Sequence, residues 1–134
     1  MTLRNTQFLA LDDLLAAALA ALGRPPEVRD YGLLESALGR PQATVFGQDA
    51  YPTLDLKAAA MLQSLLSNHA LVDGNKRLGW VAMRLFYRYN FCDLRAPEDR
   101  AFDLVMSIAD GSETDVEKIA ATLSPWVFVT KPPL

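Results

Sequence analysis

The apolar residues after position 75 recur with the period of an α-helix, and this pattern limits the possible folds more than any other feature of the sequence. They would share one helix face at Leu78, Val81, Ala82, Leu85, Phe86 and Tyr89. Side chains three and four positions apart lie on the same side of a helix, so this face is expected to be buried in a core. A second run of the same period begins after Thr53 and continues to about Leu66. Two neighbouring helices of this kind predict a helical bundle.

Shorter helical segments surround this pair, and they are predicted at residues 12–22, 31–38, 97–111 and 114–124. Asp12 is a candidate N-cap of the first, and Thr114 with Glu117 forms the pattern of a capping box at the start of the last. Residues 40–52 carry proline, glycine, threonine and valine without a helical period, which predicts a short extended piece or hairpin. The sequence thus predicts an all-α single domain over residues 1–134, with a short β-hairpin flap and an irregular tail from about residue 126.

The overall composition narrows the classes of partner. A chain of 134 residues that is 51% apolar fits one domain with a substantial core. Its net charge of −3 argues against a general nucleic-acid-binding protein, which usually carries a basic excess. The single cysteine, Cys92, cannot form an intrachain disulfide and fits a reducing compartment. Because we find neither a secretory leader nor an apolar run of roughly 18 residues, we expect a cytoplasmic protein without direct contacts to nucleic acid or membrane.

The segment between the two long predicted helices carries the residues best suited to chemistry. It reads H-A-L-V-D-G-N-K-R from His69 to Arg77. The N-terminus of a helix presents unpaired backbone N–H groups and the positive end of the helix dipole, which together attract anions. Gly74 permits a tight turn and a close approach of a phosphate to the backbone. Lys76 and its neighbour Arg77 would be unfavourable in a first helical turn unless a bound polyphosphate compensates their charge.

Two further side chains of this segment fit a phosphate site. Asp73 offers a hard oxygen ligand for Mg²⁺, which usually accompanies nucleotide phosphates. His69, the only histidine of the chain, can act as a general base near neutral pH. Each feature alone has an ordinary structural explanation, since an Asp-Gly pair is common in plain turns and a lone histidine is often a packing residue. Their combination within one short segment predicts a magnesium-phosphate site with one possible base.

The segment resembles the signature loop of the Fic/Doc superfamily, whose pattern is His-x-Phe-x-Asp/Glu-Gly/Ala-Asn-Gly/Lys-Arg. The matching residues are His69, Asp73, Gly74, Asn75, Lys76 and Arg77. The lysine form of the loop, the short chain, the helical layout and the stretch from Gly32 to Ala43 are most similar to the Doc (death-on-curing) toxins of toxin–antitoxin modules. The resemblance covers nearly the whole chain apart from the tail after Trp126, and it implies a Fic-like helical bundle with a flap.

The resemblance implies a nucleotide-dependent protein transferase and suggests a role for each matching residue. His69 would be the general base that deprotonates a target hydroxyl, and Asp73 would bind Mg²⁺. Asn75 would contact a nucleotide phosphate, and Lys76 and Arg77 would clamp phosphates. We therefore expect catalytic residues at His69, Asp73, Lys76 and Arg77, a metal ligand at Asp73, and nucleotide contacts at Gly74, Asn75, Lys76 and Arg77.

Position 76 bears on which group is transferred. Most Fic proteins carry glycine there and transfer AMP, whereas Doc-like proteins carry lysine and resemble kinases that phosphorylate a threonine of elongation factor Tu and so stop translation. Lys76 would fill space beside the backbone N–H groups, which could present the γ- instead of the α-phosphorus of ATP or another NTP. The favoured interpretation is a Doc-like toxin of the Ser/Thr-kinase type. An AMP or other NMP transferase, and an inactive Fic fold that acts only as a binding partner, are the alternatives.

The sequence also departs from the family pattern. Leu71 stands where the family has phenylalanine, and would anchor the loop in the core with less apolar area. Leu78 and Gly79 replace a usual Thr-Ala pair, and Gly79 could allow a close backbone approach.

Two expectations concern proteins that would bind this chain. No glutamate is followed by glycine or asparagine, so the self-inhibitory motif of many Fic proteins is absent. We therefore expect control in trans by an antitoxin, through a partly disordered segment that folds into an apolar groove. The flap at residues 40–52 could hold a target peptide by strand addition.

Overall fold

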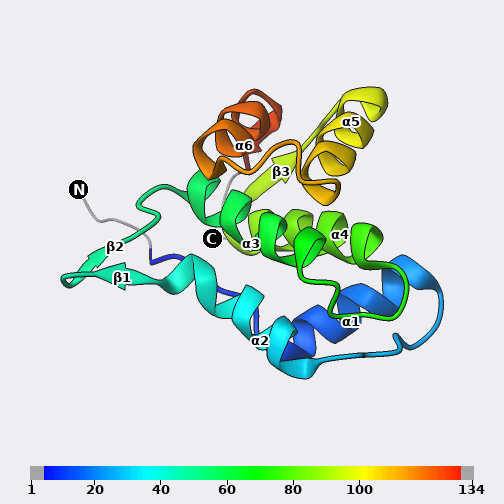
Figure 1. Cartoon of the computed structure of the whole chain (residues 1–134). Helices are drawn as coiled ribbons and strands as arrows, with labels where there is room; N and C mark the ends of the chain where they lie inside the picture. Colours follow the sequence, from blue (N-terminus) through cyan, green and yellow to red (C-terminus); the bar gives the residue numbers. More distant parts are fainter. Residues whose placement is uncertain (1–4, 131–134) are drawn as a thin grey trace.

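The computed structural model describes residues 5–130, and α-helices account for most of this part of the chain (Figure 1). The helices are α1 (Leu11–Leu22), α2 (Tyr31–Gly39), α3 (Leu54–Ser67), α4 (Asn75–Tyr89), α5 (Glu98–Ala109) and α6 (Val116–Leu123). Two 3-10 helices, η1 (Arg40–Gln42) and η2 (Ser124–Trp126), and four strands complete it: β1 (Thr44–Val45), β2 (Gln48–Asp49), β3 (Cys92–Leu94) and β4 (Val127–Val129). The predicted helical fold with a β1–β2 hairpin is confirmed. Within residues 5–130 no helix combines the length and the apolar character needed to cross a bilayer.

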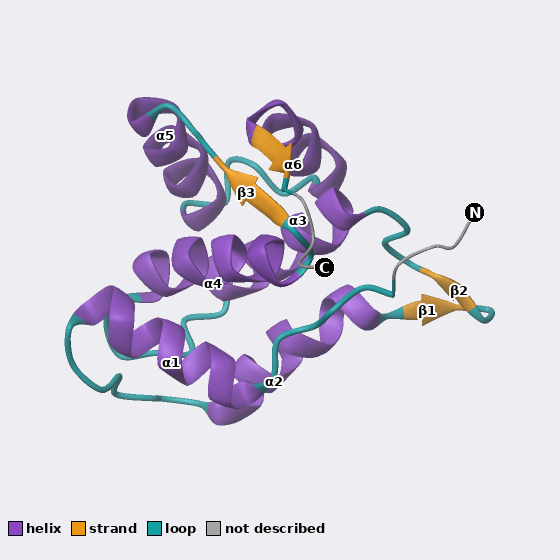
Figure 2. Ribbon diagram, turned by 180° about the vertical axis from the view of Figure 1, so that it is seen from behind, coloured by secondary structure: helices purple, strands orange, loops and turns teal. Residues whose placement is uncertain are grey.

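Helix α3 forms the centre of the core. Its residues from Lys57 to Leu62 and from Ser64 to Leu66 are buried, and it contacts α2, α4, α5 and α6. Figures 1 and 2 show α1 and α2 on one side of the α3–α4 pair, with α5 and α6 on the other. A helix that is buried on nearly every side suits this position between two layers.

Gly79 brings α4 close to α3. A β-carbon at this position would lie only 2.8 Å from Cδ2 of Leu66, nearer than such atoms approach in real structures. The close approach that the sequence suggested for Gly79 is therefore confirmed. The departure from the family's usual Thr-Ala pair coincides with a tight helix–helix contact.

The start of one helix follows the prediction, and the starts of two others differ from it. Thr53 caps α3 as expected, since its hydroxyl accepts the Leu56 N–H at 3.1 Å. Asp12 is not the N-cap of α1, because the helix begins one residue earlier and the Asp13 carboxylate accepts the N–H of the capping residue at 2.8 Å. The predicted capping box at Thr114 is wrong as well. Helix α6 begins later, and its cap is Asp115.

The hairpin between α2 and α3 is tied to the first turns of α3. Phe46 and Gly47 connect β1 to β2 with φ values of 51° and 78°, the left-handed pair of a two-residue hairpin turn. The buried Lys57 ammonium donates to the Asp49 carboxylate at 3.0 Å and to the backbone carbonyl of Tyr51. These contacts fix the base of the hairpin while the side chain of Phe46, at the tip, is fully exposed.

Residues 127–129 form a strand, which corrects the prediction of an irregular tail for this part of it; residues 131–134 of the predicted tail lie outside the described residues. Strand β4 runs antiparallel to β3, with Cys92 opposite Val129 and Leu94 opposite Val127. Trp126, just before β4, is buried. Both strands have three residues, too few for an alternating pattern to be recognised in the sequence.

Candidate active site

The chain turns sharply at His69, directly after α3. Asn68 is the C-cap of that helix, and His69 has a left-handed backbone with φ 52°. The residue after a helix C-cap often adopts this conformation, but it is usually glycine, because a β-carbon is disfavoured there. The residue is exposed, so its imidazole is accessible at the end of α3.

The middle of the loop is fixed both to the core and to the segment before α2. Leu71 is 2% exposed, so leucine occupies the core at the position where the family has phenylalanine. Its backbone forms an antiparallel bridge with Val28, and the Val72 N–H donates to the Glu27 carbonyl at 2.9 Å. Residues 27–30, here called the strap, therefore run alongside the loop.

Asn75 closes the loop from within. Its Oδ1 accepts the Leu71 N–H at 2.9 Å, and its Nδ2 donates to the Leu71 carbonyl at 3.0 Å. The side chain thus holds the loop in shape. Because an amide nitrogen carries two hydrogens, this contact leaves one N–H of Asn75 for a ligand.

Gly74 places the start of α4 beneath this loop. It is the N-cap residue with φ 90°, and a β-carbon there would lie 2.4 Å from Cδ2 of Leu22 on α1. No side chain caps α4, so its first N–H groups have no side-chain acceptor. A helix end of this kind attracts an anion through its N–H groups and its dipole.

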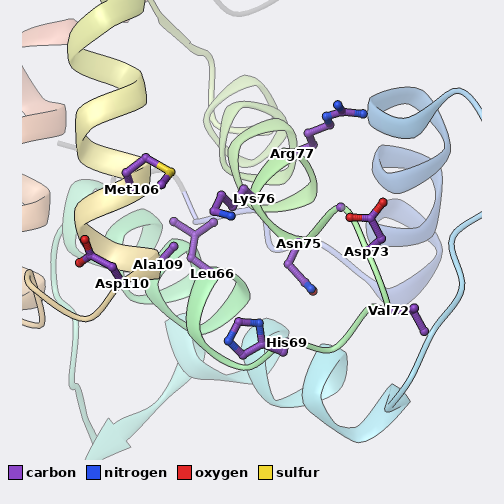
Figure 3. Close-up of a pocket in the computed structure, with 11 residues that line it drawn as sticks. Leu66, His69, Val72, Asp73, Asn75, Lys76, Arg77, Met106, Ala109 and Asp110 are labelled. Atoms are coloured by element: carbon purple, nitrogen blue, oxygen red, sulfur yellow. The ribbon is translucent and has the colours of Figure 1, made fainter.

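A cavity of about 420 Å³ opens over the start of α4 (Figure 3). The six residues to which the sequence assigned a site role line it: His69, Asp73, Gly74, Asn75, Lys76 and Arg77. Met106, Ala109 and Asp110 of the α5 region line it as well, and Figure 3 shows them on the side of the cavity opposite Asp73. The sequence analysis missed these three, because no local pattern marks them and only the packing of α5 brings them to the loop.

Asp110 adds a negative charge to the α5 side of the cavity. The N–H and the hydroxyl of Ser112 donate to its Oδ1 at 2.8 and 2.6 Å. These hydrogen bonds hold the pKa of Asp110 below its usual value, because they stabilise the ionised carboxylate.

Asp73 is the carboxylate of the loop itself. Its side chain is 83% exposed, and its Oδ2 lies 3.6 Å from a guanidinium nitrogen of Arg24. Residues 5–130 contain no cluster of three or more histidine, cysteine, aspartate or glutamate side chains that could enclose a metal ion. Mg²⁺ commonly uses one or two carboxylates and takes its other ligands from phosphates and water. Asp73 therefore fits that ion together with a nucleotide.

A second cavity of about 480 Å³ adjoins the first between α1, α4 and α5. We call it the apolar groove, and its lining comprises Ala21, Lys76, Arg77, Trp80, Val81, Ala101, Phe102, Val105 and Met106. The side chain of Phe102 is 64% exposed there. Lys76 and Arg77 line both cavities, so they connect the polar site to the apolar surface.

The β1–β2 hairpin is not part of the cavity lining. It precedes α3, whereas His69 follows it, and Figure 1 shows the hairpin at the N-terminal end of this helix. Helix α3 has 14 residues, which corresponds to a length of about 20 Å. That the hairpin holds a target peptide stays a prediction.

Comparison with known proteins identifies similar sequences. A family model described as the Fic/DOC family matches residues 2–87, which include the whole loop and the start of α4. The chain is 51% identical over 121 residues to the Toxin Doc of Mycolicibacterium smegmatis (strain ATCC 700084 / mc(2)155). This alignment covers 89% of the present chain and 92% of that protein.

Proposed function

We propose that this chain, which belongs to the Fic/DOC family, is the toxin of a toxin–antitoxin module and acts as a protein kinase. Members of this family transfer nucleotide or phosphate groups to proteins. The proposed reaction moves the γ-phosphoryl group of Mg-ATP or another NTP to a hydroxyl of a translation factor. A threonine of elongation factor Tu is the proposed target, and its modification would inhibit translation in the cytoplasm.

One observation carries this proposal: an imidazole, a carboxylate and two cations line a single cavity over a helix N-terminus that no side chain caps. His69 supplies the imidazole that acts as base, and Asp73 supplies the carboxylate that would bind Mg²⁺. Lys76 and Arg77 supply the cations. The adjacent helix end adds N–H donors. This is the set of groups that phosphoryl transfer needs, because its catalysis consists mainly of positioning and of charge stabilisation.

In the proposed reaction the imidazole of His69 accepts the proton of the target hydroxyl. The hydroxyl oxygen then forms a bond to the γ-phosphorus, while the bond from that phosphorus to the β–γ bridging oxygen breaks. The nucleoside diphosphate leaves, and Lys76, Arg77 and the N–H groups of α4 bind the phosphate oxygens during transfer. Mg²⁺ held at Asp73 would neutralise part of the phosphate charge.

Lys76 is the basis for preferring phosphate over AMP transfer. Its side chain lines both the cavity and the apolar groove, next to the N–H groups of the first turn of α4. A lysine there adds a positive charge and occupies space that a glycine would leave open. The polyphosphate would then lie with its γ-phosphorus toward His69. An AMP transferase is the second candidate, because the same loop in most Fic proteins supports that reaction.

Labelled ATP distinguishes these reactions. The purified chain is incubated with elongation factor Tu and with ATP labelled in either the γ- or the α-phosphate, and the factor is analysed by mass spectrometry. We expect transfer of the γ-label alone and a rate about 10²–10⁴-fold lower in His69→Ala. Ser67→Ala is the matched control, since Ser67 is exposed on the last turn of α3 and does not line the cavity.

The other outcomes of that experiment contradict either the kinase proposal or the role given to His69. Transfer of the α-label would identify an AMP transferase. Absence of both labels from the factor, with nucleotide still bound by the chain, would favour an inactive fold that acts as a binding partner. Equal rates for wild type and His69→Ala would remove the loop histidine from the mechanism.

The antitoxin is the second proposed partner, and the apolar groove is its proposed site. The groove is lined mainly by apolar side chains and ends at two cations, Lys76 and Arg77. An apolar segment with an acidic residue at that end would be complementary to it in both shape and charge. It would also cover two of the side chains proposed to bind phosphate, which accounts for inhibition in trans.

A further inference from the structure

The backbone of His69 needs support from outside the loop. Its φ of 52° is sparsely populated by residues that carry a β-carbon, and such conformations persist only where surrounding contacts enforce them. The position follows a helix C-cap, where glycine would adopt the same backbone without strain. A histidine at this position therefore requires contacts that keep the backbone in place.

The side chain of Arg29 makes such contacts. Its Nε donates to the His69 carbonyl at 2.9 Å, and Nη2 donates to the same carbonyl. Nη2 also lies 3.4 Å from the Asn68 carbonyl. These carbonyls lie at and just after the C-cap of α3, where a cation also complements the helix dipole. One guanidinium thus contacts the carbonyls on both sides of the His69 α-carbon, that of His69 itself and that of Asn68.

The backbone around Arg29 reinforces this contact. The N–H groups of Arg29 and Asp30 both donate to the Ala70 carbonyl, at 2.8 and 3.1 Å. Arg29 is consequently fixed to the loop by its main chain as well as by its side chain. Its side chain does not line the cavity, so it reaches the site only through the His69 backbone.

We propose that Arg29 is a positioning residue that holds the His69 imidazole in the orientation required for proton transfer. This inference rests on the proposed function, in which His69 is the base. Without the guanidinium, the His69 carbonyl loses its donors and the loop can relax toward a more common backbone conformation. The imidazole then occupies several orientations, of which only a fraction can accept the proton.

Kinetics of Arg29→Ala and Arg29→Lys test this role. Misplacement of a reacting group by about 1 Å can lower a rate by 10²-fold, so we expect kcat to fall by about that factor in Arg29→Ala. KM for the nucleotide should change less than about twofold, because Arg29 does not line the cavity. Arg29→Lys can donate to one carbonyl but lacks the planar fork, and it should recover part of kcat.

Nuclear magnetic resonance provides a measurement that is independent of activity. His69 is the only histidine, so the imidazole signals of the whole protein report on this one residue. We expect a single set of ring signals in wild type, and shifted or multiplied signals in Arg29→Ala with partial restoration in Arg29→Lys.

Arg40→Lys is the matched control. Arg40 also donates to a carbonyl of α3, that of Ala60 at 3.1 Å, and to the Ser64 hydroxyl, but it lies away from the loop. This variant should lower the melting temperature while leaving kcat and the His69 signals as in wild type. It therefore separates a loss of stability from a loss of positioning.

Three results would overturn the inference. The first is an Arg29→Ala variant with wild-type kcat and wild-type His69 signals. The second is a rise in nucleotide KM at unchanged kcat, which would place Arg29 in contact with the nucleotide. The third is an equal change of the His69 signals in Arg40→Lys, which would assign the effect to general destabilisation. If wild type transfers no label, the proposed function fails, whereas the ring signals still decide whether Arg29 orients His69.

Discussion

Two glycines of the α4 region occupy positions where an added β-carbon would displace a neighbouring leucine side chain. Gly74 lies against Leu22 of α1 and has φ 90°, and Gly79 lies against Leu66 of α3 within a regular helix. The first allows the turn into α4 at the proposed phosphate site, and the second permits a close approach of the two central helices. In both cases the missing side chain lets α4 pack against its neighbour without moving a leucine.

Replacement of Gly79 should show this packing constraint directly. Gly79→Ala places a methyl group 2.8 Å from Leu66, so we expect the free energy of unfolding to fall by about 1–3 kcal/mol. The control is Gly39→Ala at the end of α2, where no atom lies within 4 Å of the added methyl group. That variant should be neutral or more stable by up to about 1 kcal/mol, because alanine favours the helix. Urea unfolding measures both, and equal effects of the two variants would contradict the packing explanation.

The predicted site residues could be found in the sequence because they are neighbours in it. His69 through Arg77 lie in one short segment, so their combination within it was enough to predict a phosphate site. Arg29 and Asp110 could not be found in this way. Each reaches the loop through contacts between distant segments, and an arginine or an aspartate outside any motif is most often a solvated surface residue.

The positions of some helices and strands could be predicted from the sequence, and those of others could not. The long helices α3 and α4 follow from apolar residues at helical spacing, and Thr53 marked the start of α3. Helix α6 begins after Asp115 instead of Thr114, because either side chain can cap and the choice depends on local geometry. The pairing of β3 with β4 was not predicted, since two strands of three residues depend on each other across the chain.

A hydrogen bond between α1 and the end of α4 makes the stability of the contact between these two helices depend on pH. The Tyr89 hydroxyl donates to Asp13 Oδ1 at 2.6 Å, and with the Ala10 N–H it lowers the pKa of Asp13. A carboxyl with a lowered pKa contributes stability above its unfolded pKa, about 3.9, and this contribution is lost as pH falls through the folded pKa. Acid therefore weakens this contact between helices.

Thermal unfolding as a function of pH tests this contact. Between neutral pH and about pH 3, wild type should lose more stability than Tyr89→Phe, in which the hydroxyl donor is absent. The difference should be small, because the pair lies near the surface. Tyr31→Phe is the control, since Tyr31 is 55% exposed on α2 and should retain the wild-type profile. Parallel pH profiles for wild type and Tyr89→Phe would exclude a contribution from this bond.

At the scale of the whole molecule, the two layers around α3 and α4 produce two adjoining cavities, of which the first carries more polar groups than the second. The polar cavity contains the groups proposed for phosphoryl transfer, and the apolar groove beside it is lined partly by α1 and α5. Lys76 and Arg77 belong to both. The arrangement allows one partner to bind the groove and to cover the cations of the site at the same time.

Growth of cells that express this chain tests both cavities together. Expression alone should arrest growth, and His69→Ala should not. Co-expression of the cognate antitoxin should restore growth with wild type but less well with Phe102→Ala, because Phe102 is an exposed side chain of the apolar groove. Phe128→Ala is the control, since Phe128 is 48% exposed on β4 and lies outside the groove. Normal growth during expression alone would contradict the toxin proposal, and equal neutralisation of both phenylalanine variants would contradict the assignment of the groove.

The walls of the polar cavity come from residues as far apart as Leu66 and Asp110, and the strap that supports its base lies still earlier, at residues 27–30. This spread has a consequence for the synthesis of the protein. A nascent chain that has emerged only as far as α4 contains the complete signature loop but lacks the α5 side of the cavity. The site is therefore completed only after Asp110 has left the ribosome, so a protein proposed to stop translation would acquire that activity only once α5 has been synthesised and has folded onto the loop.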